Sequence, residues 1–310
     1  EGARGLVPDI HMQTIILATF FGLDRTVVAM CGAGIVVFLV ALWAAKTDIA
    51  QARGVDKFVA LSNLCFAVPL AVFGALHVAS VDFVAPLVPS YMPWRVFWAY
   101  LVGVALLAAS LSIATKIQVR WSGLLLGIMW LFFVAMLDIP GALATPGDRF
   151  GWTLLIREMC FAGGAWALAG SATGGKGGSK LVAVGRILIA IAAVFYGFEH
   201  FLHPLSRPGV PLEKLMPEWI PGRLLIGYLT GAILLVAGAC MLLGKRTRLA
   251  ATYLGGWIVL LVVFIYGPIL IASLLDPSIA VKIEGINYFA DTLLFGGAIL
   301  ALASATPRTD

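Results

Sequence analysis

The sequence has few charged residues: Asp, Glu, Lys and Arg make up 12% of its 310 residues, whereas 61% are hydrophobic. A soluble domain carries roughly 25% charged residues, because its surface must face water. A chain this apolar, with a mean hydropathy of +1.00, is therefore excluded from the water-soluble globular class. It is predicted to lie in a lipid bilayer, so membrane lipid is a predicted partner.

Cysteine is also scarce. The four cysteines fall inside apolar stretches and are far apart in the sequence: Cys31, Cys65, Cys160 and Cys240. With no Cys-x-x-Cys pair, neither a dithiol redox site nor a zinc site is indicated, so we expect no metal. No flavin or haem motif is evident either, which leaves no cofactor assigned from motifs.

Nine apolar stretches are long enough to cross a bilayer core as helices, since about 20 residues suffice. They cover residues 27–45, 58–80, 96–115, 121–143, 150–171, 181–201, 224–244, 249–275 and 286–305. The fourth and eighth are interrupted near their ends, by Asp138-Ile139-Pro140 and Tyr266-Gly267-Pro268. A shorter stretch, Ile15 to Leu23, is expected to lie in the membrane interface.

Basic residues fall mainly on one side of this nine-span topology. The loops after spans 1, 3, 5 and 7 and the C-terminus hold twelve basic and three acidic residues, so 12 − 3 gives +9. The other side holds the remaining nine basic and thirteen acidic residues, which gives −4. The basic side is predicted to be cytoplasmic in a plasma (inner) membrane, with the N-terminus outside and the C-terminus inside. The net charge of +5 therefore requires no nucleic acid as a partner.

The sequence contains an internal duplication. The run from Leu87 to Gly103 matches the run from Leu215 to Gly231 at seven of seventeen positions, among them both prolines and the arginine. At the same offset of 128, Pro140 matches Pro268. Shared apolar composition does not explain coincident Pro and Arg residues, so we interpret the chain as two copies of one unit.

The predicted fold class is therefore all-α integral membrane, with two tandem four-helix transmembrane bundles plus one extra N-terminal helix. Residues 1–57 hold the interfacial segment and the extra helix, and 58–171 form the first repeat. A glycine-rich flexible linker is expected at 172–180, followed by the second repeat at 181–310. Because each unit has an even number of helices, both copies enter the membrane in the same orientation.

Several polar residues lie within the predicted spans, where ionisable groups are costly and often functional. In the first copy these are His77, Arg95, Tyr100 and Glu158, and in the second they are Glu199, His200, Arg223, Tyr228 and Asp291. All are predicted at similar depth in the outer leaflet. We expect Arg223 to pair with Asp291 or Glu199, and Arg95 to pair with Glu158.

Two interpretations of these residues stay open. One is a structural network that fixes the helix register. The other is a pocket for the polar head of a lipophilic small molecule, such as a quinone, whose carbonyl accepts from His or Arg while a carboxylate handles a proton. The second copy is the richer site, because Glu199 stands where the first copy has Leu76.

The motifs resemble the DoxX-like membrane proteins. The resemblance rests on Phe/Tyr-Gly-x-x-His (ending at His77 and His200), on Leu-x-Pro-x-x-x-Pro-x-Arg, on Tyr-Leu-x-Gly, and on a carboxylate in the fourth helix. It covers about residues 58–171 and 181–305 and implies a four-helix transmembrane bundle. That family includes a thiosulfate:quinone oxidoreductase subunit and proteins that assist other membrane proteins or secreted cargo.

The leading prediction is a quinone-linked oxidoreductase membrane subunit that binds quinone in the second repeat and receives electrons from a redox partner subunit. The alternative is a non-catalytic membrane scaffold or assembly factor, whose polar network is structural. A transporter is a third reading. The duplication supports it, but the sequence shows no obvious paired, broken helices.

Overall fold

The computed structural model describes residues 24–210 and 213–308, so the stretch Ile15 to Leu23 lies outside the described residues. The long helices are α2 (Arg25–Gln51), α4 (Ser62–Ala79), α6 (Arg95–Thr115), α7 (Val119–Phe133), α9 (Arg149–Thr173), α10 (Gly175–Leu202), α11 (Arg223–Leu242), α12 (Thr247–Leu261) and α14 (Ile279–Ala305). Shorter elements are α3 (Asp56–Ala60), α5 (Val81–Val84), η1 (Ala85–Leu87), η2 (Val134–Asp138), α8 (Ile139–Ala144), η3 (Val262–Tyr266) and α13 (Gly267–Leu275). Within this part of the chain no strand forms, which confirms the all-α class.

Eight helical runs among the described residues are long and apolar enough to cross a membrane. The fifth predicted span, 150–171, corresponds to α9, which has 25 residues but is not among the eight, because Arg157 and Glu158 lower its hydropathy. Large side chains such as Leu225 and Phe264 are 71% and 69% exposed, an arrangement that suits lipid and not water. The prediction of a multi-pass membrane protein in contact with a bilayer is confirmed.

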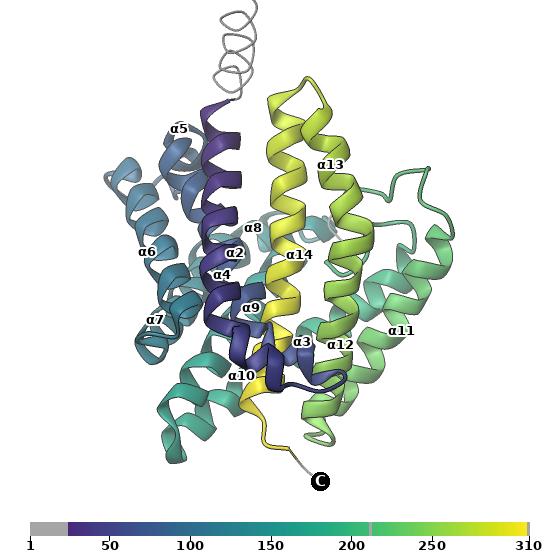
Figure 1. The fold of residues 1–310 in the computed structure, drawn as a ribbon. Coiled ribbons are helices and arrows are strands. Elements are labelled where there is room, and N and C mark those ends of the chain that lie inside the picture. The colour runs from purple at the N-terminus through teal and green to yellow at the C-terminus, as the bar shows by residue number, and fades with distance from the viewer. Residues whose placement is uncertain (1–23, 211–212, 309–310) are drawn as a thin grey trace, which may run out of the picture.

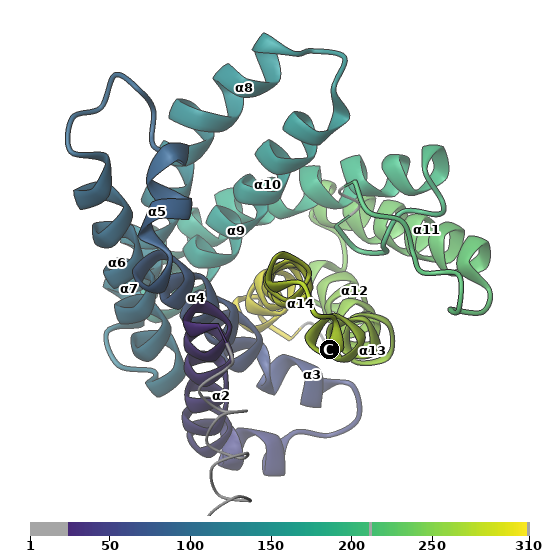
Figure 2. The same ribbon diagram turned by 90° about the horizontal axis from the view of Figure 1, so that it is seen from above.

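The helices pack in the order of the chain and then close on themselves (Figures 1 and 2). Helix α4 packs on α6, α6 on α7 and α7 on α9; α9 then packs on α10, α10 on α11, α11 on α12 and α12 on α14. Helix α14 contacts both α4 and α9, and the additional helix α2 covers α4 and α6. Apolar residues from all these helices form one continuous core, so the two halves are not separate bundles.

One end of the molecule collects the basic loops. The ends of α2, α6, α9 and α11 and the C-terminal end of α14 lie together at the bottom of Figure 1, and we call this the basic end. Its lysines and arginines are Lys46, Arg53, Lys57, Lys116, Arg120, Lys176, Lys180, Arg186, Lys245, Arg246, Arg248 and Arg308. The start of α2, α5 and the α13–α14 turn lie at the other end, which we call the opposite end.

The glycine-rich segment 172–180 is not a flexible linker, so that prediction is wrong. Only Gly174, with φ +66°, separates α9 from α10. A Cβ added to Gly170 would lie 2.6 Å from the carbonyl oxygen of Gly178, and one added to Gly163 would lie 2.7 Å from that of Gly185. The glycines therefore allow two helix backbones to touch, which gives them a packing role in a membrane hairpin.

Both predicted interruptions are π-helical segments within continuous helical runs. Segment η2 ends at Asp138 and precedes Pro140, and η3 ends at Tyr266 and precedes Pro268. A proline inside a helix lacks an N–H and collides with the carbonyl four residues earlier. A π-turn relieves this conflict without ending the helix, and such turns frequently occur at functional sites.

Candidate functional site

Two arginines of α9 form ion pairs with acidic residues of later helices. Arg149 lies at the first position of α9, and its Nη1 is 3.0 Å from Glu199 Oε2 on α10. Arg157 Nη1 is 2.9 Å from Asp291 Oδ2 on α14. The side chains of Arg157 and Asp291 are only 17% and 11% exposed. Since Arg157 comes eight positions after Arg149, it lies roughly 12 Å deeper along the helix.

Further carboxyl groups gather around Arg157. Glu158 Oε1 lies 3.5 Å from Arg157 Nη2, and the side chain of Asp138, from η2, is within hydrogen-bonding range of Glu158. With both acids ionised, two of their oxygens, Asp138 Oδ2 and Glu158 Oε2, are buried without a hydrogen-bond donor. Two carboxyl groups bond to one another only when one of them carries a proton. The arrangement can therefore hold a proton beside Arg157.

We call Asp138, Arg157, Glu158 and Asp291 the charge network. It contains three acids and one base within helices of membrane-spanning length, and it joins the π-segment η2 to α9 and α14. Another buried polar atom nearby on α14, Asn287 Oδ1, also lacks a partner. A network built only for stability would satisfy its buried polar atoms, because each one left unpaired is costly.

His200 is fully buried and both of its ring nitrogens are used within the protein. Its Nε2 accepts a hydrogen bond from the backbone N–H of Gly209 at 3.0 Å. The other nitrogen, Nδ1, must then carry the proton and donate to the carbonyl oxygen of Tyr196 at 2.7 Å. His200 therefore fixes the loop after α10 and has no ring nitrogen left for a ligand.

The predicted partners of the carboxylates are wrong. Arg223 donates to the carbonyl oxygen of Met216 at 3.2 Å and forms no ion pair with Asp291 or Glu199. Arg95 forms none with Glu158, whose ion-pair partner is Arg157. The reason lies in the packing, because α11 does not contact α14 and α6 does not contact α9.

The two tyrosines of the prediction lie away from the charge network. Tyr100 and Tyr228 are 41% and 43% exposed, and the ring of Tyr228 packs against Phe201 with centroids 5.8 Å apart. His77 is half-buried, and its Nδ1 forms a hydrogen bond of 2.8 Å with the carbonyl oxygen of Phe73. Of the predicted residues, the structure thus brings Glu158 and Asp291 together, with Glu199 and the buried His200 in the adjacent helix α10.

Arg149, Arg157 and Asp138 were missed as site residues. Arg157 and Glu158 form a charged pair inside an apolar stretch, which is the same signal that selected Glu158. Asp138 precedes Pro140 by two residues and was noticed only as an interruption. A further missed residue is Arg207 in the loop after α10. It is 9% exposed, and its guanidinium carbon lies 4.4 Å from the ring centre of Tyr288.

Comparisons of the chain with protein-family models, with curated proteins and with solved structures gave no match. Within residues 24–210 and 213–308, no group of three or more His, Cys, Asp or Glu side chains is arranged to hold a metal ion.

Proposed function

We propose that the protein is the membrane subunit of a quinone-linked oxidoreductase, and that its charge network exchanges protons with the quinone head group. The observation that carries this proposal is the excess of acid over base around Arg157, with a carboxyl pair that needs a proton to stay together. Reduction of a quinone consumes two electrons and two protons. The network supplies a place for protons, and a redox partner subunit supplies the electrons.

The proposal places the quinone beside the charge network, within the membrane. Glu158 and Asp138 hold and release the proton, and Arg157 stabilises negative charge that develops on a quinone oxygen. The Arg149–Glu199 pair lies nearer the opposite end, and its arginine is 29% exposed. His200 acts as a positioning residue for the loop that follows α10.

We also propose that the chain is a tandem duplication of a DoxX-like four-helix unit. Two structural features recur at equivalent positions of the two halves. His77 and His200 each form a hydrogen bond with the carbonyl oxygen four residues earlier. The π-segments η2 and η3 each precede one of the matched prolines. Helix crossings match as well. An added Cβ would lie 2.8 Å from His77 Cβ at Gly103 and 3.0 Å from His200 Cβ at Gly231.

A transporter is the second candidate function, and the paired π-segments favour it. Interrupted apolar helices at corresponding positions of two halves are typical of transporters built from repeats. In a transporter, the Arg149–Glu199 and Arg157–Asp291 pairs would hold the two halves together. Titration with a quinone separates the two candidates, because a transporter of polar solutes has no affinity for quinones.

The orientation is proposed from the positive-inside rule, with the basic end in the cytoplasm and the membrane a plasma (inner) membrane. Single cysteines at Gly177 and at Leu215, both exposed, test it in a protein whose four native cysteines are replaced. A membrane-impermeant maleimide should label Leu215→Cys in intact cells and Gly177→Cys only after permeabilisation. Labelling of both positions from the same side would contradict this topology.

Titration of the detergent-solubilised protein with a short-chain quinone, followed by tryptophan fluorescence, tests the proposed function. We expect saturable binding that Glu158→Gln weakens about ten- to a hundredfold, the effect of losing a hydrogen bond to a charged group. Asp82→Asn is the matched control, because Asp82 is an exposed carboxylate on α5, outside the charge network.

Two results would overturn the quinone function. One is the absence of saturable binding to the unmodified protein. The other is equal binding by the unmodified protein and Glu158→Gln, accompanied by a large loss of thermal stability in the variant. The second result would favour a membrane scaffold or assembly factor with a structural network.

A further inference from the structure

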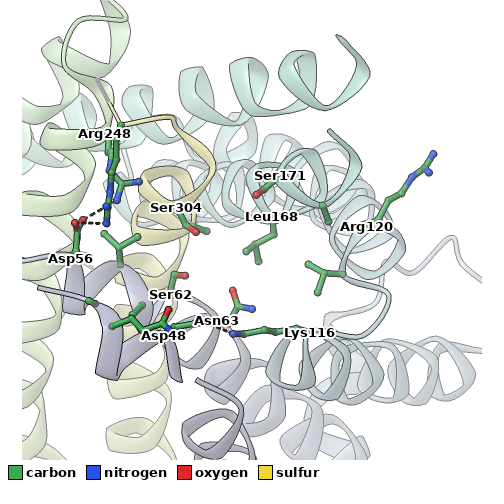
Figure 3. A pocket seen from close by; sticks show the side chains of 18 of the residues that line it. Asp48, Asp56, Ser62, Asn63, Lys116, Arg120, Leu168, Ser171, Arg248 and Ser304 are labelled. Carbon is green, nitrogen blue, oxygen red and sulfur yellow. Dashed lines mark hydrogen bonds and ion pairs between the residues drawn. The ribbon is translucent and has the colours of Figure 1, made fainter. Parts of the chain in front are cut away.

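A second polar site lies at the basic end, far along the helices from the charge network. A cavity of about 990 Å³ opens there between helices of both halves (Figure 3). Its walls come from the end of α2, from α3, the start of α4, the turn between α6 and α7, the ends of α9 and α14, and Arg248 of α12. Binding pockets for small molecules commonly enclose about 300–1,000 Å³, so the cavity has room for an organic ligand.

Hydroxyl and amide groups surround the hollow. Figure 3 shows Ser62, Asn63, Ser171 and Ser304 around it. Ser171 and Ser304 are exposed, from the last turns of α9 and α14. Hydroxyl groups in this position are free to donate to an incoming anion.

Positive charge exceeds negative charge in the lining. The cations are Lys116, Arg120, Arg248 and Arg308, and the carboxylates are Asp48 and Asp56, so 4 − 2 gives a net charge of +2. Asp56 Oδ1 lies 2.8 Å from Arg248 Nη2, and its Oδ2 lies 2.7 Å from Arg308 Nη2. A single carboxylate thus neutralises two arginines only in part.

The other two cations are available to a ligand. Lys116 pairs with Asp48, but the two side chains are 39% and 50% exposed, and ion pairs at such exposed positions are weak. Arg120 forms no ion pair with a described carboxylate, and its guanidinium carbon lies 5.1 Å from the ring centre of Trp121. In Figure 3 its side chain stands at the rim and turns away from the hollow. An exposed side chain of this kind reorients within nanoseconds, so it can turn to meet an anion.

We propose that this cavity binds a phosphate-bearing anion, with Arg120 and Lys116 on the phosphate oxygens and the serine hydroxyls as further donors. Arginine binds phosphate through two parallel N–H groups, and lysine adds a point charge. A free phosphate ion is far smaller than the cavity, so the ligand is a phosphate ester whose organic part occupies the remaining space. Its source is either the head group of an anionic phospholipid or a soluble phosphate ester of the adjoining aqueous phase.

The cavity is separated from the charge network by closely packed backbone. Its lining includes Leu168 on α9 and Ala301 on α14. One turn further along these helices, a Cβ added to Gly164 would lie only 2.5 Å from Ala298 Cβ. The phosphate site therefore does not depend on the quinone proposal, and each can fail without the other.

The test uses the full chain in two settings, with thermal stability and equilibrium binding as readouts. In detergent, glycerol 3-phosphate is titrated into the protein. In nanodiscs, phosphatidylglycerol is compared with phosphatidylcholine. Stabilisation by glycerol 3-phosphate identifies a soluble ester as sufficient, and stabilisation by phosphatidylglycerol alone identifies a lipid head group. Either result supports the site.

We expect Arg120→Gln and Lys116→Gln each to weaken binding by at least tenfold, or about 1.4 kcal/mol. Ser171→Phe should also weaken binding, because it removes a hydroxyl donor and narrows the cavity with no change in charge. Arg53→Gln is the control, because Arg53 is an exposed arginine of the same end outside the cavity lining. The proposal is overturned if neither phosphate source stabilises the unmodified protein, or if Arg53→Gln weakens binding as much as Arg120→Gln.

Discussion

Replacing Arg157 with methionine is expected to destabilise the protein by about 3–5 kcal/mol, the largest effect of any single change proposed for this chain. Arg157 is the one cation in a network with three carboxyl groups. With one proton shared between Asp138 and Glu158, two negative charges face one positive charge. Removal of Arg157 leaves two uncompensated negative charges among packed helices, where water cannot solvate them.

Methionine is the chosen replacement because it keeps the unbranched stem of arginine and removes only the charged head. Arg223→Met is the matched control, since Arg223 is half-buried and its guanidinium bonds to one backbone carbonyl. Thermal unfolding in detergent measures both. A loss in Arg157→Met no greater than that in Arg223→Met would show that the charge network carries little of the stability.

The positions of the helices could be predicted from the sequence with good accuracy. The stretches 96–115 and 121–143 correspond to helical runs Arg95–Thr115 and Val119–Ala144. A membrane helix must form its backbone hydrogen bonds internally and present about 20 apolar residues to the lipid. The local composition of the sequence therefore indicates where each helix lies. The prolines at the interruptions were also recognised, although the π-turns that absorb them were not.

The ion-pair partners could not be predicted, because they depend on which helices are neighbours. Arg223 and Asp291 belong to the same predicted unit and to similar depths, yet α11 and α14 do not touch. Glu199 and Asp291 instead meet arginines of α9, from the other half of the chain. The assumption of two separate bundles led to the wrong ion-pair partners, because it restricted each carboxylate to partners within its own unit.

The prediction of a flexible linker at residues 172–180 was wrong for a related reason. Composition alone does not distinguish a flexible linker from a tight helical hairpin, since glycine serves both. In this chain the glycines of α9 and α10 face one another, as at Gly163 and Gly185, and the close contact between these helices brings Arg149 next to Glu199. The same glycines that suggested mobility thus help to position the site.

The double variant Arg157→Met, Asp291→Asn is expected to recover about 1–3 kcal/mol of the free energy of unfolding that Arg157→Met alone loses. Asp291 Oδ2 lies 2.9 Å from Arg157 Nη1, so the two charges are directly coupled. Removing both leaves one negative charge on the Asp138–Glu158 pair, in place of two. By the same count, Asp291→Asn alone leaves the network neutral and should cost far less than Arg157→Met.

The rescued protein also separates stability from function. If the network serves a quinone, the double variant should fold and still bind the short-chain quinone at least tenfold more weakly than the unmodified protein, because the guanidinium that stabilises the quinone oxygen is gone. A double variant that regains stability and binds quinone normally would remove Arg157 from the binding site. If Asp291→Asn recovers no stability in the Arg157→Met background, then Arg157→Met acts through lost packing. An electrostatic cause predicts recovery, because the second change removes the carboxylate that the first one leaves unpaired.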